Sequence, residues 1–223
     1  MNQTTLNVLI TCMGIPVLFA GTLTSAFAQS HQPSRALDAK VEKFLNENRA
    51  YWHDWNVPYE DGRVLYSLIV KNNYRKALEI GTSTGHSAIW MAWALSKTNG
   101  KLITIEIDEN RYGTALKNFK KAGVEEFIDA RLADAHQLVK ELAGPFDFVF
   151  SDADKEWYTQ YFKNTEKKLA VGGCFTAHNV TDGFGGIKEF LDYIRSLSNY
   201  QTTIDRSSSS GISISYKKSS APS

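Results

Sequence analysis

The sequence predicts an α/β protein built on a doubly wound sheet that is mostly parallel. From residue 75 onward, short apolar runs alternate with stretches in which apolar residues recur at helical spacing, and this alternation is typical of parallel strands joined by helices. The end of the chain differs, because only "SSSS" at 207–210 separates two strand-like stretches. We therefore expect a C-terminal hairpin with one antiparallel strand, and helices on both faces of the sheet.

The elements follow from apolar periodicity, taken in chain order. Two helices are expected before the sheet, over residues 34–50 and about 59–73, with Pro58 breaking the pattern between them. The expected strands are 75–81, 101–107, 127–133, 146–152 and 172–180, with the hairpin at 200–206 and 211–218. The expected crossover helices are 87–97, 110–123, 135–144, 156–170 and 186–198. In such Rossmann-like sheets, ligands bind beyond the carboxyl ends of the strands.

The first 28 residues have the pattern of a secretory signal peptide. No Lys, Arg, Asp or Glu occurs before Arg35, an apolar run extends from Leu6 to Leu23, and "AFA" precedes Gln29. These features predict cleavage after Ala28 and an exported, periplasmic protein of one domain, 29–223. The alternative is an uncleaved membrane anchor; after cleavage we expect no stable membrane association.

Composition narrows the class of partner. The net charge is +1, which gives no electrostatic reason to expect nucleic acid, so a small-molecule substrate is favoured and a homodimer is left open. Cys174 is the only cysteine in 29–223, so this domain cannot form an internal disulfide.

A nucleotide signal lies in the first strand–helix turn. Gly81 and Gly85 straddle this turn in "LEIGTSTGHS", where glycine lets the backbone approach a ligand closely. One strand later, Glu106 ends "ITIE", and an acidic residue there can accept hydrogen bonds from ribose hydroxyls. The G-x-x-x-G spacing and Glu79 argue against NAD and an oxidoreductase, because a carboxylate would repel a pyrophosphate. They favour the cationic cofactor S-adenosylmethionine.

Four motifs together resemble one enzyme family. "LEIGTSTGHSAIWMA", "ITIEID", "FVFSDADKEWY" and "GGCFTAHNV" look like the class I S-adenosylmethionine-dependent O-methyltransferases of the catechol and caffeoyl-CoA type. The resemblance covers roughly residues 50–217. It implies a set of cofactor-binding residues: Val57, Glu79, Gly81, Thr82, Gly85, Ser87, Glu106, Asp134, Ala135, His136 and Asp152. Within that set, Glu79 and Ser87 would hold the amino-acid end, Glu106 the ribose, and 134–136 would border the adenine.

The same resemblance implies catalytic and metal-binding residues. Asp152 would bind a divalent metal that acidifies the acceptor hydroxyl, and Lys155 would take its proton. The family has an Asp-Asn pair at the next strand end, whereas this chain has His178 and Asn179. An Asp152–His178–Asn179 site suits Mn²⁺ or Zn²⁺ better than Mg²⁺. The alternative is that His178 abolishes metal binding and serves as a base.

The expected function is methyl transfer from S-adenosylmethionine to a hydroxyl of a small, aromatic vicinal diol. Trp52, His53 and Trp55 precede the Val57 position and would supply walls for a planar acceptor, or simply cover the sheet edge. The alternative function is a cofactor-binding protein of this fold without metal-dependent catalysis. The predicted export conflicts with the predicted cofactor, because S-adenosylmethionine is made in the cytoplasm and an exported enzyme would work outside it.

Overall fold

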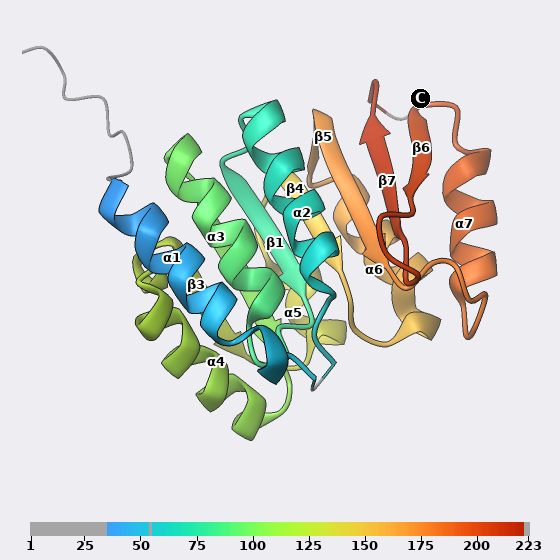
Figure 1. The fold of residues 1–223 in the computed structure, drawn as a ribbon. Coiled ribbons are helices and arrows are strands. Elements are labelled where there is room, and N and C mark those ends of the chain that lie inside the picture. Colours follow the sequence, from blue (N-terminus) through green and yellow to red (C-terminus); the bar gives the residue numbers. More distant parts are fainter. Residues whose placement is uncertain (1–34, 54, 221–223) are drawn as a thin grey trace, which may run out of the picture. The chain divides into compact units, whose positions relative to one another are not determined.

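A computed structural model describes residues 35–53 and 55–220 (Figure 1). The expected signal peptide and its cleavage site lie outside these residues. Among the residues described, no helix is both long and apolar enough to cross a membrane.

The sheet has seven strands in the order β3-β2-β1-β4-β5-β7-β6. β1 to β5 are parallel, and β7 runs antiparallel to both β5 and β6. The predicted fold class is therefore confirmed, with β7 as the single antiparallel strand. The strands are β1 (Lys76–Ile80), β2 (Lys101–Glu106), β3 (Ile128–Leu132), β4 (Phe146–Ser151), β5 (Leu169–His178), β6 (Tyr200–Asp205) and β7 (Ile212–Lys217).

Helices cover both faces of the sheet. One apolar cluster lies between the sheet and the helices α1 to α4, and a second lies between the sheet and α5 to α7; Figure 1 shows α2 and α3 in front of the sheet and α6 behind it. The helices are α1 (Arg35–Glu47), α2 (Tyr59–Asn72), α3 (His86–Thr98), α4 (Glu109–Ala122), α5 (Ala135–Glu141), α6 (Tyr158–Glu166) and α7 (Ile187–Ser196). Short 3₁₀ turns are η1 (Arg49–Tyr51), η2 (Glu125–Phe127) and η3 (Lys155–Trp157).

The expected boundary between 156–170 and 172–180 is wrong. α6 ends at Glu166, and β5 already begins at Leu169, which is buried and pairs with Phe146 on β4. Gly172 has a φ of +83°, and the pairing jumps from Leu169 opposite Phe146 to Cys174 opposite Phe148. The glycine pair "GG" thus marks an irregularity inside the strand rather than the loop before it.

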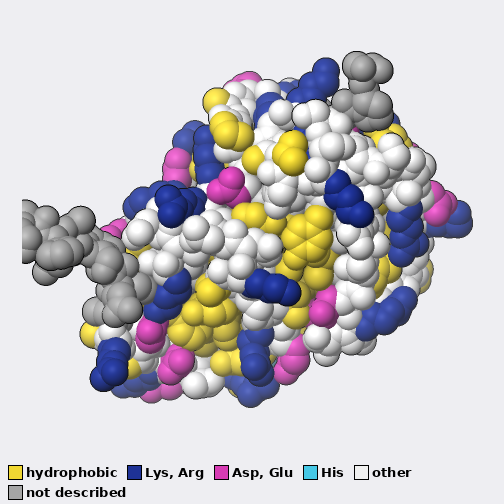
Figure 2. Space-filling model, turned by 90° about the horizontal axis from the view of Figure 1, so that it is seen from above, with side chains coloured by type: hydrophobic (Ala, Val, Ile, Leu, Met, Phe, Trp, Pro, Cys, Tyr) yellow, Lys and Arg dark blue, Asp and Glu magenta, His cyan; other side chains and the backbone are white. Residues whose placement is uncertain are grey.

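The strand order reverses beside β1, and this reversal positions the site. β2 and β3 lie on one side of β1, and β4 and β5 lie on the other. Ile80 pairs with Ser151, and the carbonyl of Ile80 accepts a hydrogen bond from the backbone N–H of Asp152 at 2.9 Å. The turns after β1 and β4 therefore leave the sheet side by side, which opens a crevice at its carboxyl edge. Figure 2 shows the opposite end of the molecule, where Lys and Arg side chains surround an apolar centre.

Candidate functional site

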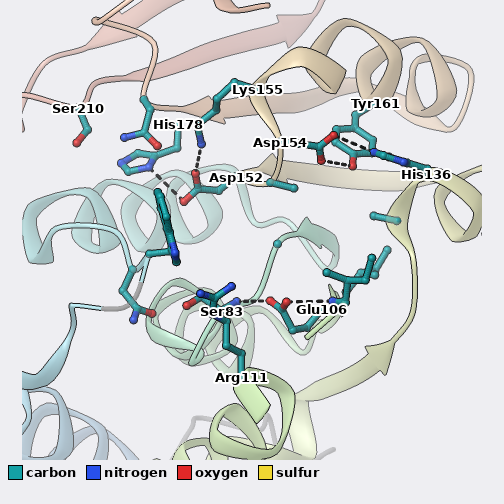
Figure 3. Close-up of a pocket in the computed structure, with 18 of the residues that line it drawn as sticks. Ser83, Glu106, Arg111, His136, Asp152, Asp154, Lys155, Tyr161, His178 and Ser210 are labelled. Carbon is teal, nitrogen blue, oxygen red and sulfur yellow. Dashed lines mark hydrogen bonds and ion pairs between the residues drawn. The ribbon is translucent and has the colours of Figure 1, made fainter. Parts of the chain in front are cut away.

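A cavity of about 950 Å³ lies at the carboxyl edge of the sheet (Figure 3). Its volume is within the range of pockets that bind small molecules and cofactors. The wall combines the turns after four parallel strands, the loop before α2, and the loop before α7. The predicted site residues that line it are Gly81, Glu106, Asp134, Ala135, His136, Asp152, Lys155, His178 and Asn179.

Glu106 anchors the turns on one side of the cavity. One carboxylate oxygen accepts a hydrogen bond from the backbone N–H of Ser83 at 2.6 Å. The other accepts from the N–H groups of Ile107 and Asp108, both at 3.0 Å. Glu106 is 7% exposed and lines the cavity, so its carboxylate is fixed at the place where ribose hydroxyls are expected to bind.

The two glycines of the first turn are required by packing. A Cβ on Gly81 would lie 2.7 Å from the carbonyl oxygen of Asp152, and one on Gly85 would lie 2.5 Å from the Phe119 ring. Both have φ near +100°, which a side chain rarely allows. Gly81 lines the cavity whereas Gly85 packs against α4, so the turn's shape depends on close contact with β4 and α4.

Several residues expected at the methionine end face the protein interior. Glu79 is fully buried and accepts hydrogen bonds from the hydroxyls of Ser87 and Thr104, each at 2.5 Å. Burial outweighs these hydrogen bonds and raises the pKa of Glu79 to about 8. None of these side chains lines the cavity. Val57 and Thr82 do not line it either. The carbonyl of Val57 instead lies 2.9 Å from His86 Nδ1. Their direct contact with the cofactor stays a prediction.

A polar and aromatic cluster forms the expected adenine side. The His136 ring stacks on Trp157 with 3.7 Å between centroids. His136 Nε2 lies 2.8 Å from Asp154, which also accepts a hydrogen bond from the Tyr161 hydroxyl at 2.7 Å. The Asp134 side chain caps α5 by accepting from the backbone N–H of His136. Asp154 therefore joins two elements across the cavity wall, and its carboxylate does not cap its own helix.

Asp152, Lys155 and His178 meet at the cavity wall, on the expected acceptor side (Figure 3). The Lys155 ammonium donates to Asp152 Oδ1 at 2.8 Å and to the Tyr158 hydroxyl at 2.9 Å. His178 Nδ1 lies 3.2 Å from Asp152 Oδ2. The structure thus brings together the predicted general base and two of the three predicted metal ligands, and Asn179 lines the same cavity.

Asp61, in the first turn of α2, was not predicted as a site residue. It is 1% exposed, and its Oδ2 lies 2.8 Å from His178 Nε2. Ser208, in the turn between β6 and β7, donates to the same oxygen at 2.6 Å. In the sequence, Asp61 is only an acidic residue in a helix's first turn, and such residues are common on surfaces, so its burial could not be foreseen.

The charges of this cluster set its protonation. Burial alone would lower the pKa of His178, but Asp152 and Asp61 outweigh it and raise the pKa to about 9. Burial alone would raise the pKa of Asp152, but His178 and Lys155 outweigh it and hold the pKa below its usual value. The stable form at neutral pH is therefore an imidazolium between two carboxylates.

These contacts do not fit the predicted metal centre. A metal-bound histidine offers a lone pair from a deprotonated nitrogen, whereas both ring nitrogens of His178 face carboxylate oxygens. The Lys155 ammonium occupies the other oxygen of Asp152. Among residues 35–53 and 55–220, no group of three or more His, Cys, Asp or Glu side chains has an arrangement that could hold a metal ion.

A family model described as O-methyltransferase matches residues 29–195. The chain belongs to this O-methyltransferase family. A flavonoid 3',5'-methyltransferase of Vitis vinifera is 34% identical over 184 residues, which are 77% of this chain and 75% of that protein. A catechol O-methyltransferase of Niastella koreensis is 41% identical over 129 residues, which are 56% of this chain and 58% of that protein.

A solved structure agrees with this assignment. The O-methyltransferase from Bacillus cereus in complex with SAH has a TM-score of 0.70 at 27% identity, over 81% of this chain and 91% of that one. The family predicted from four sequence motifs is therefore confirmed, and the protein is an S-adenosylmethionine-dependent O-methyltransferase of the catechol and caffeoyl-CoA type. The cavity and the buried, cavity-lining Glu106 carboxylate fit this cofactor.

Proposed function

We propose that this O-methyltransferase methylates one hydroxyl of a small aromatic vicinal diol. The observation that carries the proposal is the Asp152–Lys155–His178 cluster, which lines the same cavity as Glu106. Polar groups that can bind two neighbouring hydroxyls therefore face the side of the cavity where a methyl donor is expected. The names of the catechol and flavonoid methyltransferases among its relatives support an aromatic acceptor.

Exposed aromatic side chains support a planar acceptor. Trp55 is 80% exposed and Phe184 is 77% exposed, and both line the cavity. They come from the loops before α2 and α7. Trp52, in contrast, stacks on His86 with 4.5 Å between centroids. Of the predicted wall residues only Trp55 lines the cavity, which supports its contact with an acceptor. An aromatic ring that is exposed at a cavity mouth contributes binding free energy when it stacks on a flat apolar ligand and both surfaces are buried.

The protein's own residues supply positioning and proton transfer. When bound, S-adenosylmethionine supplies a methyl group on a positively charged sulfur. Glu106 would hold the ribose, and 134–136 would border the adenine, since these residues line one wall. Lys155 first gives a proton of its ammonium group to solvent and then, as the neutral amine, takes the proton of the acceptor hydroxyl. The oxygen forms a bond to the methyl carbon while the carbon–sulfur bond breaks and its electron pair stays on sulfur.

The test combines binding and turnover. Calorimetry should show S-adenosylhomocysteine binding to the purified protein, and mass spectrometry should show a monomethylated product from catechol. Resorcinol, with its hydroxyls one carbon further apart, is the matched control and should react far more slowly. Binding without methylation of any diol would favour the alternative of a cofactor-binding protein, and equal rates on both compounds would remove the vicinal-diol assignment.

We also propose that residues 1–28 are a signal peptide and that 29–223 is exported. The support is the uncharged apolar segment ending in "AFA" before Gln29. Intact-mass analysis of protein from the cell envelope should find a chain beginning at Gln29. A chain that still begins at Met1 and sediments with membranes would support the anchor instead.

A further inference from the structure

His178 occupies a closed position between two carboxylates. Its ring lies between Asp61 on α2 and Asp152 at the end of β4, with nitrogen–oxygen distances of 2.8 and 3.2 Å. Its side chain is 4% exposed. Nε2 is hydrogen-bonded to Asp61, whereas Nδ1 lies beside Asp152 as an ion pair without a hydrogen bond. A buried ring with a carboxylate oxygen beside each nitrogen is stabilised as a cation by both negative charges. The geometry therefore describes a cation enclosed by two anions.

The cluster is electrically balanced by its own side chains. Asp61 and Asp152 contribute two negative charges, while His178 and the Lys155 ammonium contribute two positive charges. A divalent cation entering here would meet two cations at close range and no surplus negative charge. It would also have to displace a proton from His178 before the ring could ligate.

Further contacts hold the ring in this position. Ser208 donates to the Asp61 oxygen that faces His178 Nε2. The backbone carbonyl of His178 accepts from the Tyr158 hydroxyl at 3.1 Å, and that hydroxyl accepts from Lys155. The ring is thus fixed by α2, the hairpin turn, β4 and α6, which leaves it little freedom to turn towards an ion.

We propose that the imidazolium of His178 takes the place of a divalent metal in this enzyme, so that Asp152 and Lys155 are positioned for methyl transfer without one. This inference rests on the proposed function. His178 acts as a positioning residue: it fixes one oxygen of Asp152 and leaves the other to orient Lys155. Asp61 is the positioning residue that holds His178 in turn. The imidazolium offsets the negative charge of Asp152, which would otherwise oppose the charge that develops on the acceptor oxygen as its proton leaves.

The first test measures metal binding directly. Purified full-length protein with S-adenosylhomocysteine bound is mixed with Mn²⁺, and the electron paramagnetic resonance signal of free Mn²⁺ is recorded. We expect no uptake by the wild type. In His178→Asp, three carboxylates face one another with no imidazolium, so we expect uptake of one Mn²⁺. Stoichiometric uptake by the wild type that His178→Gln abolishes would overturn the inference, and this result does not depend on whether His178→Asp folds.

The second test measures metal dependence of the reaction. Wild type treated with EDTA should methylate catechol at the untreated rate, and added Mg²⁺ should not raise it. His178→Asp without metal should lose at least about ten-fold, equal to 1.4 kcal/mol, and should regain activity with Mg²⁺ or Mn²⁺. Asp61→Asn should lower the rate without creating metal dependence, whereas Asp192→Asn, in an exposed pair with Lys188 on α7, should change nothing.

The two proposals fail in different ways. Loss of wild-type activity on chelation, restored by Mg²⁺, would overturn the metal-free inference and leave the diol assignment standing. Absence of diol methylation with or without metal, while S-adenosylhomocysteine still binds, would overturn the substrate proposal. The Mn²⁺ titration would then still decide the role of His178, because it needs no acceptor.

Discussion

The two halves of the cavity are built in different ways. On the expected cofactor side, Glu106 accepts hydrogen bonds from three backbone N–H groups, one in the turn after β1 and two in the turn after β2. On the expected acceptor side, charged side chains from α2, the turn after β4, η3 and the end of β5 hold one another. A site made of backbone groups is set by the fold, whereas a site made of side-chain pairs can change character with one substitution. The following predictions test that contrast.

The largest expected effect is on the acceptor side. Lys155→Met removes the proton acceptor and should lower kcat by about 10²–10⁴-fold, the usual contribution of general base catalysis. Binding of S-adenosylhomocysteine, measured by calorimetry, should stay unchanged because Glu106 and its turn are untouched. Lys188→Met, an exposed lysine on α7, is the control. Parallel loss of cofactor binding in Lys155→Met would show that the two halves are not independent.

The next effect is on the cofactor side. Glu106→Gln replaces one accepting oxygen with an NH2 group that can only donate, so either a ribose hydroxyl or a backbone N–H loses its acceptor. We expect S-adenosylhomocysteine binding to weaken by about 1–3 kcal/mol. Isothermal titration would measure it, with the exposed Glu189→Gln on α7 as the matched control. Equal affinity in both variants would remove Glu106 from the binding site.

A third prediction concerns the interior behind the cofactor side. The pKa of Glu79 is raised from 4.5 to about 8 by burial, so the folded state binds this proton more tightly than the unfolded state. The associated stability is complete below pH 4.5 and is lost as pH rises through 8. Each pH unit in that window should cost up to about 1.4 kcal/mol of unfolding free energy.

Denaturant unfolding of wild type and Glu79→Gln across pH 5 to 9 checks this dependence. The neutral amide resembles the protonated acid, so the difference between the two proteins should grow with pH in favour of the variant. His178 has a pKa raised to about 9, so it also makes the unfolding free energy fall as pH rises. This contribution is the same in both proteins and cancels in the difference between them. A difference that stays constant with pH would mean that Glu79 is ionised throughout.

The smallest expected effect is at the mouth of the acceptor side. Trp55→Ala removes an exposed aromatic wall, and an aromatic contact is worth about 0.5–1.5 kcal/mol. We expect KM for catechol to rise by the corresponding factor with kcat and S-adenosylhomocysteine affinity unchanged. Tyr51→Ala, at an exposed aromatic outside the cavity, is the control. An unchanged KM would assign Trp55 no role in acceptor binding.

The contrast also explains what the sequence could predict. The sheet, its hairpin and the positions of Glu106, Asp152 and Lys155 followed from apolar periodicity and from residues at strand ends, because local patterns determine where strands end. The partner of His178 did not follow, because Asp61 lies 117 residues earlier and resembles an ordinary helix-start acid. Glu79 was expected to face the cofactor, but alternation along a strand does not say which neighbouring hydroxyls will enclose a carboxylate.

The serine run between the last two strands reads in the sequence as a plain connection. In the structure its Ser208 bonds Asp61, and Ser210 lines the cavity. The family model matches up to residue 195, and this stretch follows that match. Selection could therefore adjust the choice of acceptor by editing a short exposed turn, without disturbing the turns that hold Glu106. Among related enzymes, the residues at the positions of 207–210 would then correlate with the acceptor that each enzyme methylates more closely than the motifs that identify the family.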